Sequence, residues 1–207
     1  MGEDERITFH ASLILLKNWR KKMTHTRKMA LVAILSAVSF LLMYLKFPLI
    51  PTASFLEIDF SVIPILLGLV ILDIKSATAI LMIRTLLKFL LNNSGPSTII
   101  GLPMNIVAML IFVAAFAFLW KAKKTRANFI KASLVGSIGL TVVMLILNYV
   151  YAIPVYAKFA NFDIEKILGI SNYLFAMVLP FNLLQGLILS AVFYLVYSGF
   201  QSYLKKF

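Results

Sequence analysis

Four uncharged amide side chains interrupt long apolar stretches of this 207-residue chain. They are Asn105, Asn148, Asn182 and Gln185. An amide left without a hydrogen-bonding partner in hydrocarbon costs several kcal/mol, and each amide can both donate and accept. Any single one is explained equally well as a bridge between two helices. Four together, at similar depth, favour a shared interior site that binds a small polar molecule.

The composition identifies an integral membrane protein, since 61% of the residues are hydrophobic. The chain has no cysteine, which excludes disulfides, thiolate metal sites, iron–sulfur clusters and cysteine nucleophiles. Its two histidines, His10 and His25, lie outside the apolar stretches and form no ligand cluster. We therefore expect neither a metal site nor a cofactor.

Six apolar runs are of roughly the length that a helix needs to cross about 30 Å of hydrocarbon. They cover residues 29–47, 60–73, 76–91, 98–120, 128–152 and 173–203. The second and third runs are short and nearly continuous, so one bent or partly re-entrant hairpin is the alternative there. Strands are not expected, because the runs lack the alternation of a membrane barrel. The predicted fold is an all-α integral membrane protein, a six-transmembrane-helix bundle that forms a single domain over residues 23–207.

Basic residues are concentrated in the connections on one side of this predicted bundle, which indicates that both termini are cytoplasmic. The formal net charge of +12 follows from this asymmetry and from contact with anionic lipid headgroups of the bilayer. Nucleic-acid binding is therefore not expected. The basic residues on the cytoplasmic side are Lys17, Arg20, Lys21, Lys22, Arg27, Lys28, Lys75, Lys121, Lys123, Lys124, Arg126, Lys131, Lys205 and Lys206.

Residues 1–22 differ from the rest of the chain. Half of the first six are acidic, and the apolar stretch 11–16 is too short to span a membrane. A cleaved signal peptide would begin with its basic residues, and this segment does not. We interpret it as an extension introduced by cloning or by an upstream start, with a surface amphipathic helix as the alternative.

The four amides fall in the outer half of the predicted bundle. At about 1.5 Å per residue, Asn148 lies about 6 Å, Asn105 about 10 Å and Asn182 about 13 Å from the outer end of its helix. Gln185 follows Asn182 by three residues, so both lie on one helical face. These positions predict that Asn148, Asn182 and Gln185 line one pocket, with Asn105 nearby.

The connection from Phe47 to Asp59 is unusually apolar for an exposed loop. Its prolines keep it extended, and its apolar side chains prefer to pack inward over the mouth of the bundle. We expect it to cover the site, and simple resting on neighbouring helices is the alternative. The further candidate site residues at this end are Lys88, Gly95, Pro96, Leu56, Glu57 and Phe60.

Arg84 lies deep in the third predicted helix and cannot comfortably face lipid. Its expected role is to satisfy backbone carbonyls or a polar pocket wall, since no acidic residue is available within the spans as a partner for proton transfer. The first predicted helix carries Ala30, Ala33 and Ala37, a small-residue face that lets another helix approach closely. This face suits either a partner subunit or packing within the bundle.

Several of these features together resemble one family. They are the six spans, the Ala33-xxx-Ala37 pair, the segment 55–60 at the entry to the second helix, the turn 92–98, and Pro180-Phe181-Asn182-Leu183-Leu184-Gln185 on the sixth. The chain resembles the substrate-binding S-components of energy-coupling factor (ECF) vitamin transporters, and in particular the riboflavin-specific ones. The resemblance extends from Met23 to the C-terminus.

This resemblance implies a high-affinity riboflavin-binding subunit in a bacterial cell membrane. A coupling membrane protein and two ATP-binding-cassette ATPases would drive delivery, and the chain itself contains no G-x-x-x-x-G-K-[ST] phosphate loop. An S-component for another vitamin and a self-sufficient small-molecule carrier remain as alternatives. A membrane-embedded enzyme is disfavoured, because the spans carry no cluster of histidines or acids and no serine–base pair.

Overall fold

The computed structural model describes residues 24–160 and 162–204, and the predicted extension at residues 1–22 lies outside them. The long helices are α2 (His25–Leu42), α3 (Val62–Ile71), α4 (Ile74–Leu91), α5 (Pro96–Ala115), α6 (Arg126–Leu147) and α9 (Leu179–Leu204). The short elements are β1 (Lys46–Pro48), the 3₁₀-turn η1 (Pro51–Ala53), β2 (Glu57–Asp59), α7 (Ile153–Phe159), α8 (Ile164–Leu168) and the π-helical segments η2 (Phe116–Trp120), η3 (Asn148–Ala152) and η4 (Asn172–Val178).

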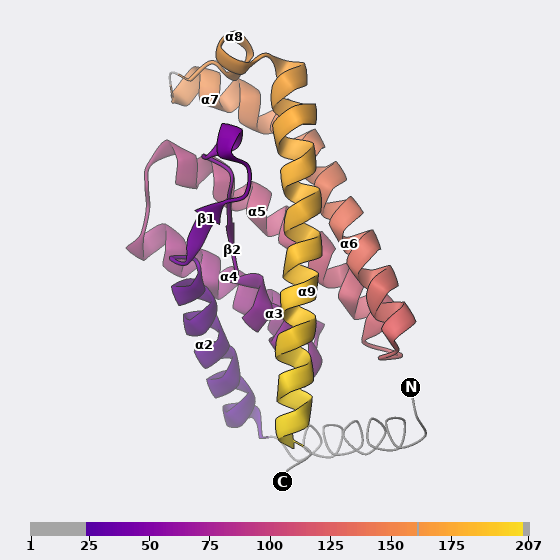
Figure 1. Cartoon of the computed structure of the whole chain (residues 1–207). Helices are drawn as coiled ribbons and strands as arrows, with labels where there is room; N and C mark the ends of the chain where they lie inside the picture. Colours follow the sequence, from indigo (N-terminus) through magenta and orange to yellow (C-terminus); the bar gives the residue numbers. More distant parts are fainter. Residues whose placement is uncertain (1–23, 161, 205–207) are drawn as a thin grey trace.

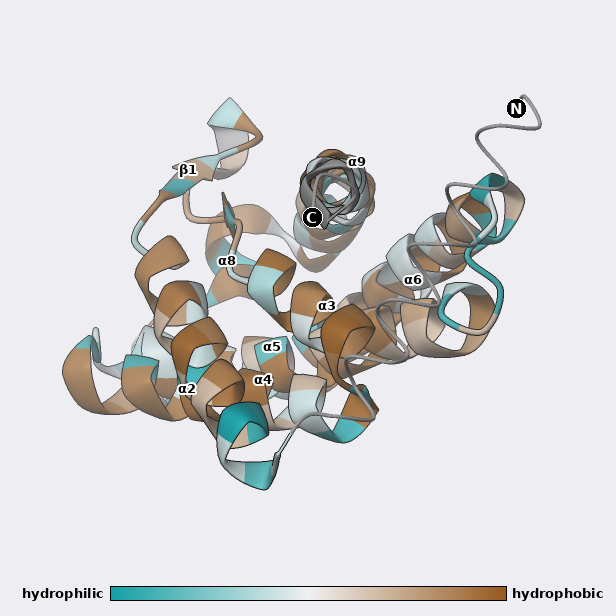
Figure 2. Cartoon of the chain, turned by 90° about the horizontal axis from the view of Figure 1, so that it is seen from below, coloured by the Kyte–Doolittle hydropathy of each residue, from teal (hydrophilic) through white to brown (hydrophobic). Residues whose placement is uncertain are grey.

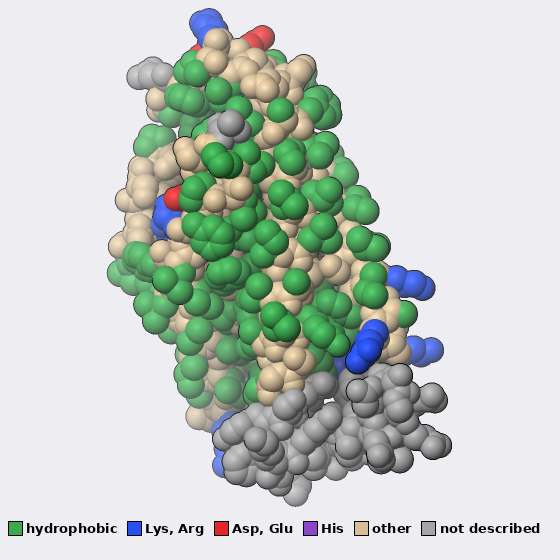
Figure 3. All heavy atoms as spheres, in the orientation of Figure 1, with side chains coloured by type: hydrophobic (Ala, Val, Ile, Leu, Met, Phe, Trp, Pro, Cys, Tyr) green, Lys and Arg blue, Asp and Glu red, His purple; other side chains and the backbone are tan. Residues whose placement is uncertain are grey.

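The start of α2 and the end of α9 lie at one end of the molecule, while α7, α8 and the tip of the hairpin lie toward the other (Figure 1). Most residues of the helices are hydrophobic, as the predominantly brown ribbon in Figure 2 shows. In the space-filling view, hydrophobic side chains cover the middle of the visible face, and charged side chains lie mainly toward the two ends (Figure 3). This surface suits a lipid environment.

Four helical segments have the length and apolar composition to cross a membrane: His25–Leu42, Pro96–Trp120, Arg126–Phe159 and Asn172–Phe200. The prediction of a helical membrane protein is therefore confirmed. The count of six is not decided, because α3 has only 10 residues and about 20 are needed for a full crossing. Only Leu72 and Asp73 separate α3 from α4.

The boundaries of the fifth predicted helix were wrong at its outer end. The sequence reading stopped it at residue 152, shortly before Pro154, whereas η3 and α7 continue it without a break to Phe159. Pro154 follows directly on the π-helical segment η3, and local π adjustments of this kind compensate for the N–H that a proline lacks inside a membrane helix.

The loop between α2 and α3 contains a short antiparallel hairpin that the sequence did not predict. Lys46 pairs with Asp59, Phe47 with Ile58 and Pro48 with Glu57. The Lys46 ammonium group and the Glu57 carboxylate also form an ion pair across it. Strands of three residues carry too little pattern to be distinguished from extended loop. The hairpin nevertheless fixes the register of the proposed cover.

At the end where α2 begins, an ion pair joins α2 to the turn between α3 and α4. Lys28 Nζ lies 2.6 Å from Asp73 Oδ2, and Asp73 Oδ1 caps α4 by accepting from Ser76 N at 2.8 Å. Partial burial would raise the pKa of the Asp73 carboxyl group, but the hydrogen bonds from Lys28 and Ser76 outweigh it and lower the pKa to about 2. Asp73 thus stays ionised and holds the three helices together.

Candidate functional site

Asn148 and Tyr173 are joined by a buried hydrogen bond between two π-helical segments. The Tyr173 hydroxyl donates to Asn148 Oδ1 at 2.6 Å, and Asn148 Nδ2 donates to the Met144 carbonyl one turn earlier at 2.7 Å. Asn148 begins η3 and Tyr173 lies in the first turn of η4. Such single π-turns re-aim the side chains that follow them and are frequent at functional sites.

Asn182 and Gln185 lie buried on α9, next to η4. Asn182 Nδ2 donates to the Val178 carbonyl at 2.7 Å, which leaves Oδ1 as the atom able to accept. Gln185 makes no hydrogen bond to another side chain or to the backbone within residues 24–160 and 162–204. A buried amide of this kind has its hydrogen-bonding capacity available for a ligand.

The helix boundaries change the expected depths of the amides. Asn105 is nine residues from the start of α5, Asn148 eleven from the end of α7, and Asn182 ten from the start of η4. At about 1.5 Å per residue these separations correspond to about 13 to 17 Å, so the 6 Å expected for Asn148 was too small. The three amides therefore lie at more nearly equal distances from their helix ends than the sequence suggested. Their grouping in one pocket stays a prediction.

The hairpin loop packs inward against the segment that carries Tyr173. Ala53 of η1 is fully buried in an apolar cluster with Tyr173 and Met177, and Leu56 packs against the same cluster. The Phe55 ring stacks on the Tyr173 ring with centroids 6.3 Å apart. This placement agrees with a loop that covers the end of the bundle next to η4.

The other two predicted loop residues lie at the hairpin and at its exit. Glu57 is exposed and is used in its ion pair with Lys46. Phe60 is half-buried, packs against the main apolar core and lies 6.0 Å from the Phe47 ring, measured between centroids. Neither residue contacts the amides within the described part of the chain, and their ligand roles remain predictions.

Arg84 and Asn105 form a second polar cluster, which the sequence did not predict as a pair. Arg84 is fully buried; one guanidinium nitrogen donates to Ser61 Oγ at 2.5 Å and another to Asn105 Oδ1 at 2.6 Å. Ser39 Oγ donates to the Ser61 carbonyl, which adds α2 to the network. The partners of Arg84 are thus a hydroxyl and an amide rather than the backbone carbonyls expected as one alternative. Asn105 consequently has a structural use besides any contact with a ligand.

We expect Asn105→Asp and Asn105→Leu to separate these two uses. Aspartate still accepts from Arg84 but has no N–H to give a ligand, whereas leucine leaves part of a buried guanidinium group unpaired, at a cost of about 1.5–3 kcal/mol. Thermal unfolding in detergent should show a lower melting temperature for the leucine variant only. If Asn105→Asp also leaves the affinity for the bound ligand unchanged, Asn105 serves Arg84 alone.

The three remaining predicted residues lie around the connection from α4 to α5. Lys88 is half-buried and donates to Asn92 Oδ1 at 3.1 Å. Gly95 has a positive φ of 76° before Pro96 begins α5, a backbone conformation that favours glycine. This backbone conformation accounts for Gly95 and Pro96 by local structure, and their roles in binding remain predictions.

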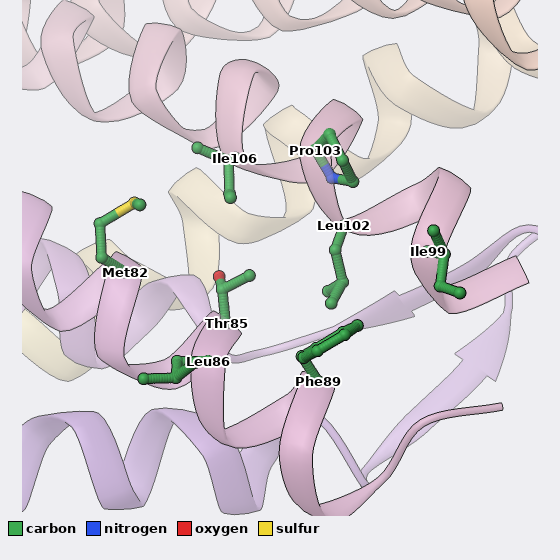
Figure 4. Close-up of a pocket in the computed structure, with 8 residues that line it drawn as sticks. All are labelled: Met82, Thr85, Leu86, Phe89, Ile99, Leu102, Pro103 and Ile106. Atoms are coloured by element: carbon green, nitrogen blue, oxygen red, sulfur yellow. The ribbon is translucent and has the colours of Figure 1, made fainter. Parts of the chain in front are cut away.

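The described part of the chain contains an apolar groove between α4 and α5, and none of the predicted amides lines it. Figure 4 shows its lining, and its volume is about 380 Å³. Several of the lining side chains are exposed on the outer surface of the bundle, which agrees with contact to lipid. The lining residues are Met82, Thr85, Leu86, Phe89, Ile99, Leu102, Pro103 and Ile106.

The predicted docking face lies on the outside of the bundle. Ala30, Ala33 and Ala37 are all exposed on α2, whereas Ser36 and Ser39 face inward and are buried.

Among residues 24–160 and 162–204, no three histidine, aspartate or glutamate side chains are grouped as a metal site requires. The amides and the apolar clusters beside them offer hydrogen-bonding groups and apolar surface for a bound molecule.

Comparison with known proteins agrees with this assignment. A family model described as the substrate-specific component of ECF transporters matches residues 27–197. The riboflavin transporter RibU of Streptococcus thermophilus is 57% identical over 193 residues, covering 93% of this chain and 92% of that protein. The RibU protein of Leuconostoc mesenteroides subsp. mesenteroides is 38% identical over 188 residues, covering 89% and 96% of the two chains.

A solved structure described as the S component of a bacterial ECF transporter has the same fold. It superposes with a TM-score of 0.72 at 27% sequence identity, over 88% of this chain and 99% of that one. Its family is one of transporter components and not of enzymes. This chain therefore belongs to the family of substrate-specific components of ECF transporters.

Proposed function

We propose that this protein is the riboflavin-binding subunit of an ECF importer in a bacterial cell membrane. The observation that carries the proposal is the 57% identity, over nearly the whole chain, to the RibU riboflavin transporter of S. thermophilus. The protein captures the vitamin at the end of the bundle that carries the hairpin, α7 and α8. Partner subunits then supply the energy of ATP hydrolysis.

The chemistry of the site supports this substrate. Riboflavin has a largely apolar tricyclic ring, a uracil-like edge with donors and acceptors, and a neutral polyol. Asn182 keeps an accepting oxygen, and Gln185 keeps both kinds of group, which suits such an edge. Leu56, Tyr173 and Met177 provide apolar surface for the ring nearby. An analogue that left the amides unpaired would bind more weakly.

The topology of the proposed subunit follows from its charge distribution and the short α3. We propose six spans, with α3 and α4 forming two of them, and both termini in the cytoplasm. The basic residues of the α5–α6 connection and Lys28 lie at the cytoplasmic end in this orientation. The exposed alanines of α2 meet a coupling membrane protein, which in turn is driven by two ATPases.

The purified protein should bind riboflavin, and Asn148→Ala or Asn182→Ala should weaken that binding by about 1–3 kcal/mol, or roughly 5- to 150-fold. Each substitution leaves a ligand group without its buried partner. Quenching of riboflavin fluorescence on titration into detergent-solubilised protein measures the Kd. Asn128→Ala is the control, since Asn128 lies at the opposite end of α6 and its amide donates to the Lys123 carbonyl.

Two results would contradict the proposal at different levels. If wild-type protein neither copurifies with a yellow chromophore nor quenches riboflavin fluorescence, riboflavin is not the substrate. If wild type binds riboflavin and both alanine variants bind it equally well, the substrate is right and the assigned site is wrong. ATP-dependent uptake only in the presence of the partner subunits distinguishes the proposed subunit from a self-sufficient carrier.

A further inference from the structure

Tyr173 contacts both the buried amide of Asn148 and the hairpin loop. Its hydroxyl donates to Asn148 Oδ1, and its ring stacks on that of Phe55 with an interplanar angle of 24°. Tyr173 and Asn148 are only 5% and 4% exposed, whereas Phe55 is 53% exposed. A single side chain therefore spans the distance from the accessible surface of the loop to a buried polar group.

The hydrogen bonds of Asn148 fix the plane of its amide at both ends. Nδ2 donates to the Met144 carbonyl and Oδ1 accepts from Tyr173. An amide nitrogen has two hydrogens and an amide oxygen two lone pairs, so Asn148 retains one donor and one acceptor position. The bond to Met144 alone would allow the amide to swing with χ2, whereas the second bond holds it in one orientation.

The second contact makes this orientation depend on the loop. The Phe55 ring stacks on the Tyr173 ring, and Ala53 packs into the same cluster as Tyr173 from the neighbouring turn. When the loop is in this position, the Tyr173 ring is confined between it and the buried residues of η4. Movement of the loop away from η4 removes that confinement, so Tyr173 and with it Asn148 gain freedom.

We propose that Tyr173 is a positioning residue for riboflavin binding, which orients Asn148 only while the loop 49–59 covers the site. The inference rests on the proposed function. Its energetic basis is preorganisation: an amide already held in one orientation loses less freedom when a ligand binds to it. Loop closure and hydrogen bonding to the vitamin are thus linked through one phenol group.

The test is Tyr173→Phe, which removes the hydroxyl and keeps the ring that stacks on Phe55. We expect the riboflavin Kd in detergent to rise about three- to tenfold, the range for one hydrogen bond. In an Asn148→Ala background the same substitution should cause no further loss, because Tyr173 acts through Asn148. Tyr149→Phe is the matched control, since Tyr149 lies in η3 but is 59% exposed.

A label on the loop provides a readout that a purely structural role would not change. The chain has no cysteine, so Ser54→Cys provides a single attachment point for a nitroxide on an exposed residue. Riboflavin should lower the mobility of the label in the otherwise unchanged protein, and the fall should be smaller in Tyr173→Phe.

An unchanged Kd in Tyr173→Phe would overturn the inference, as would an equal additional loss in the Asn148→Ala background. Equal immobilisation of the label in both proteins would overturn the link to the loop. Failure of the proposed function is distinguishable, because the protein with native Tyr173 would then show no riboflavin binding at all.

Discussion

Replacing Ala33 with tryptophan is expected to abolish ATP-driven riboflavin uptake while leaving riboflavin binding intact. Ala33 lies at the centre of the exposed face that Ala30 and Ala37 complete on α2. Helices associate closely in a membrane through small residues, and an indole ring at this position keeps the partner helix away. The proposed binding site involves η3, η4 and α9 instead, so the vitamin should still bind.

The measurement pairs two assays on the same variant. Riboflavin affinity is determined in detergent, and uptake is followed in vesicles that contain the coupling protein and both ATPases with ATP enclosed. Val38→Trp is the matched control, because Val38 is 41% exposed on α2 and is not three or four residues from any of the three alanines. Normal uptake by Ala33→Trp would show that this face does not dock. Loss of binding as well would assign the alanines to internal packing.

The second large effect is expected at Gly186. This glycine of α9 packs directly against Ser137 of α6. A Cβ atom at this position would lie 2.4 Å from Ser137 Oγ and 2.8 Å from Ser137 Cα. Because the latter is a backbone atom, a rotamer change cannot relieve the contact and the helices must separate. Gly186→Ala should lower the free energy of unfolding by about 1–3 kcal/mol, and Gly186→Leu should lower it further.

A lower melting temperature of the detergent-solubilised protein would report this loss. Gly199→Ala on the same helix is the control, since no heavy atom lies within 4 Å of its added Cβ atom and alanine favours helix by up to about 1 kcal/mol. Combining Gly186→Ala with Ser137→Gly should restore part of the stability by removing the side chain that the new methyl group meets. A Gly186→Ala protein that melts like wild type would contradict the close packing of these helices.

The sequence predicted those parts of the structure that depend on apolar length. Helices α5, α6 and α9 followed from uninterrupted hydrophobic runs, since a backbone in lipid must satisfy its own hydrogen bonds. The hairpin could not be predicted in this way. The pairing of Lys46 with Asp59 joins two strands of only three residues each, which is too short for a recognisable alternation of polar and apolar residues. The extension of the fifth helix through Pro154 to Phe159 was not predicted either.

The site was harder to predict than the fold for a similar reason. The four amides were conspicuous because they are costly in hydrocarbon, whereas Tyr173 was not, since tyrosine is common near the ends of membrane helices. The π-turn at η4 determines where its hydroxyl lies, and no sequence pattern marks such a turn. The pairing of Arg84 with Asn105 across 21 residues likewise depends on how α4 and α5 face each other.

The peripheral position of α2 determines which contributions to the binding free energy favour the docking of a partner protein there. Only 11% of its membrane-length window is buried within the bundle, compared with 33% to 44% for the other three spans of this length. A docking helix therefore displaces acyl chains and not water, so the usual gain from dehydrating apolar surface is missing. Affinity must come from the fit of the two surfaces alone. Such an association should show little change in heat capacity, little sensitivity to ionic strength, and ready exchange of one partner for another.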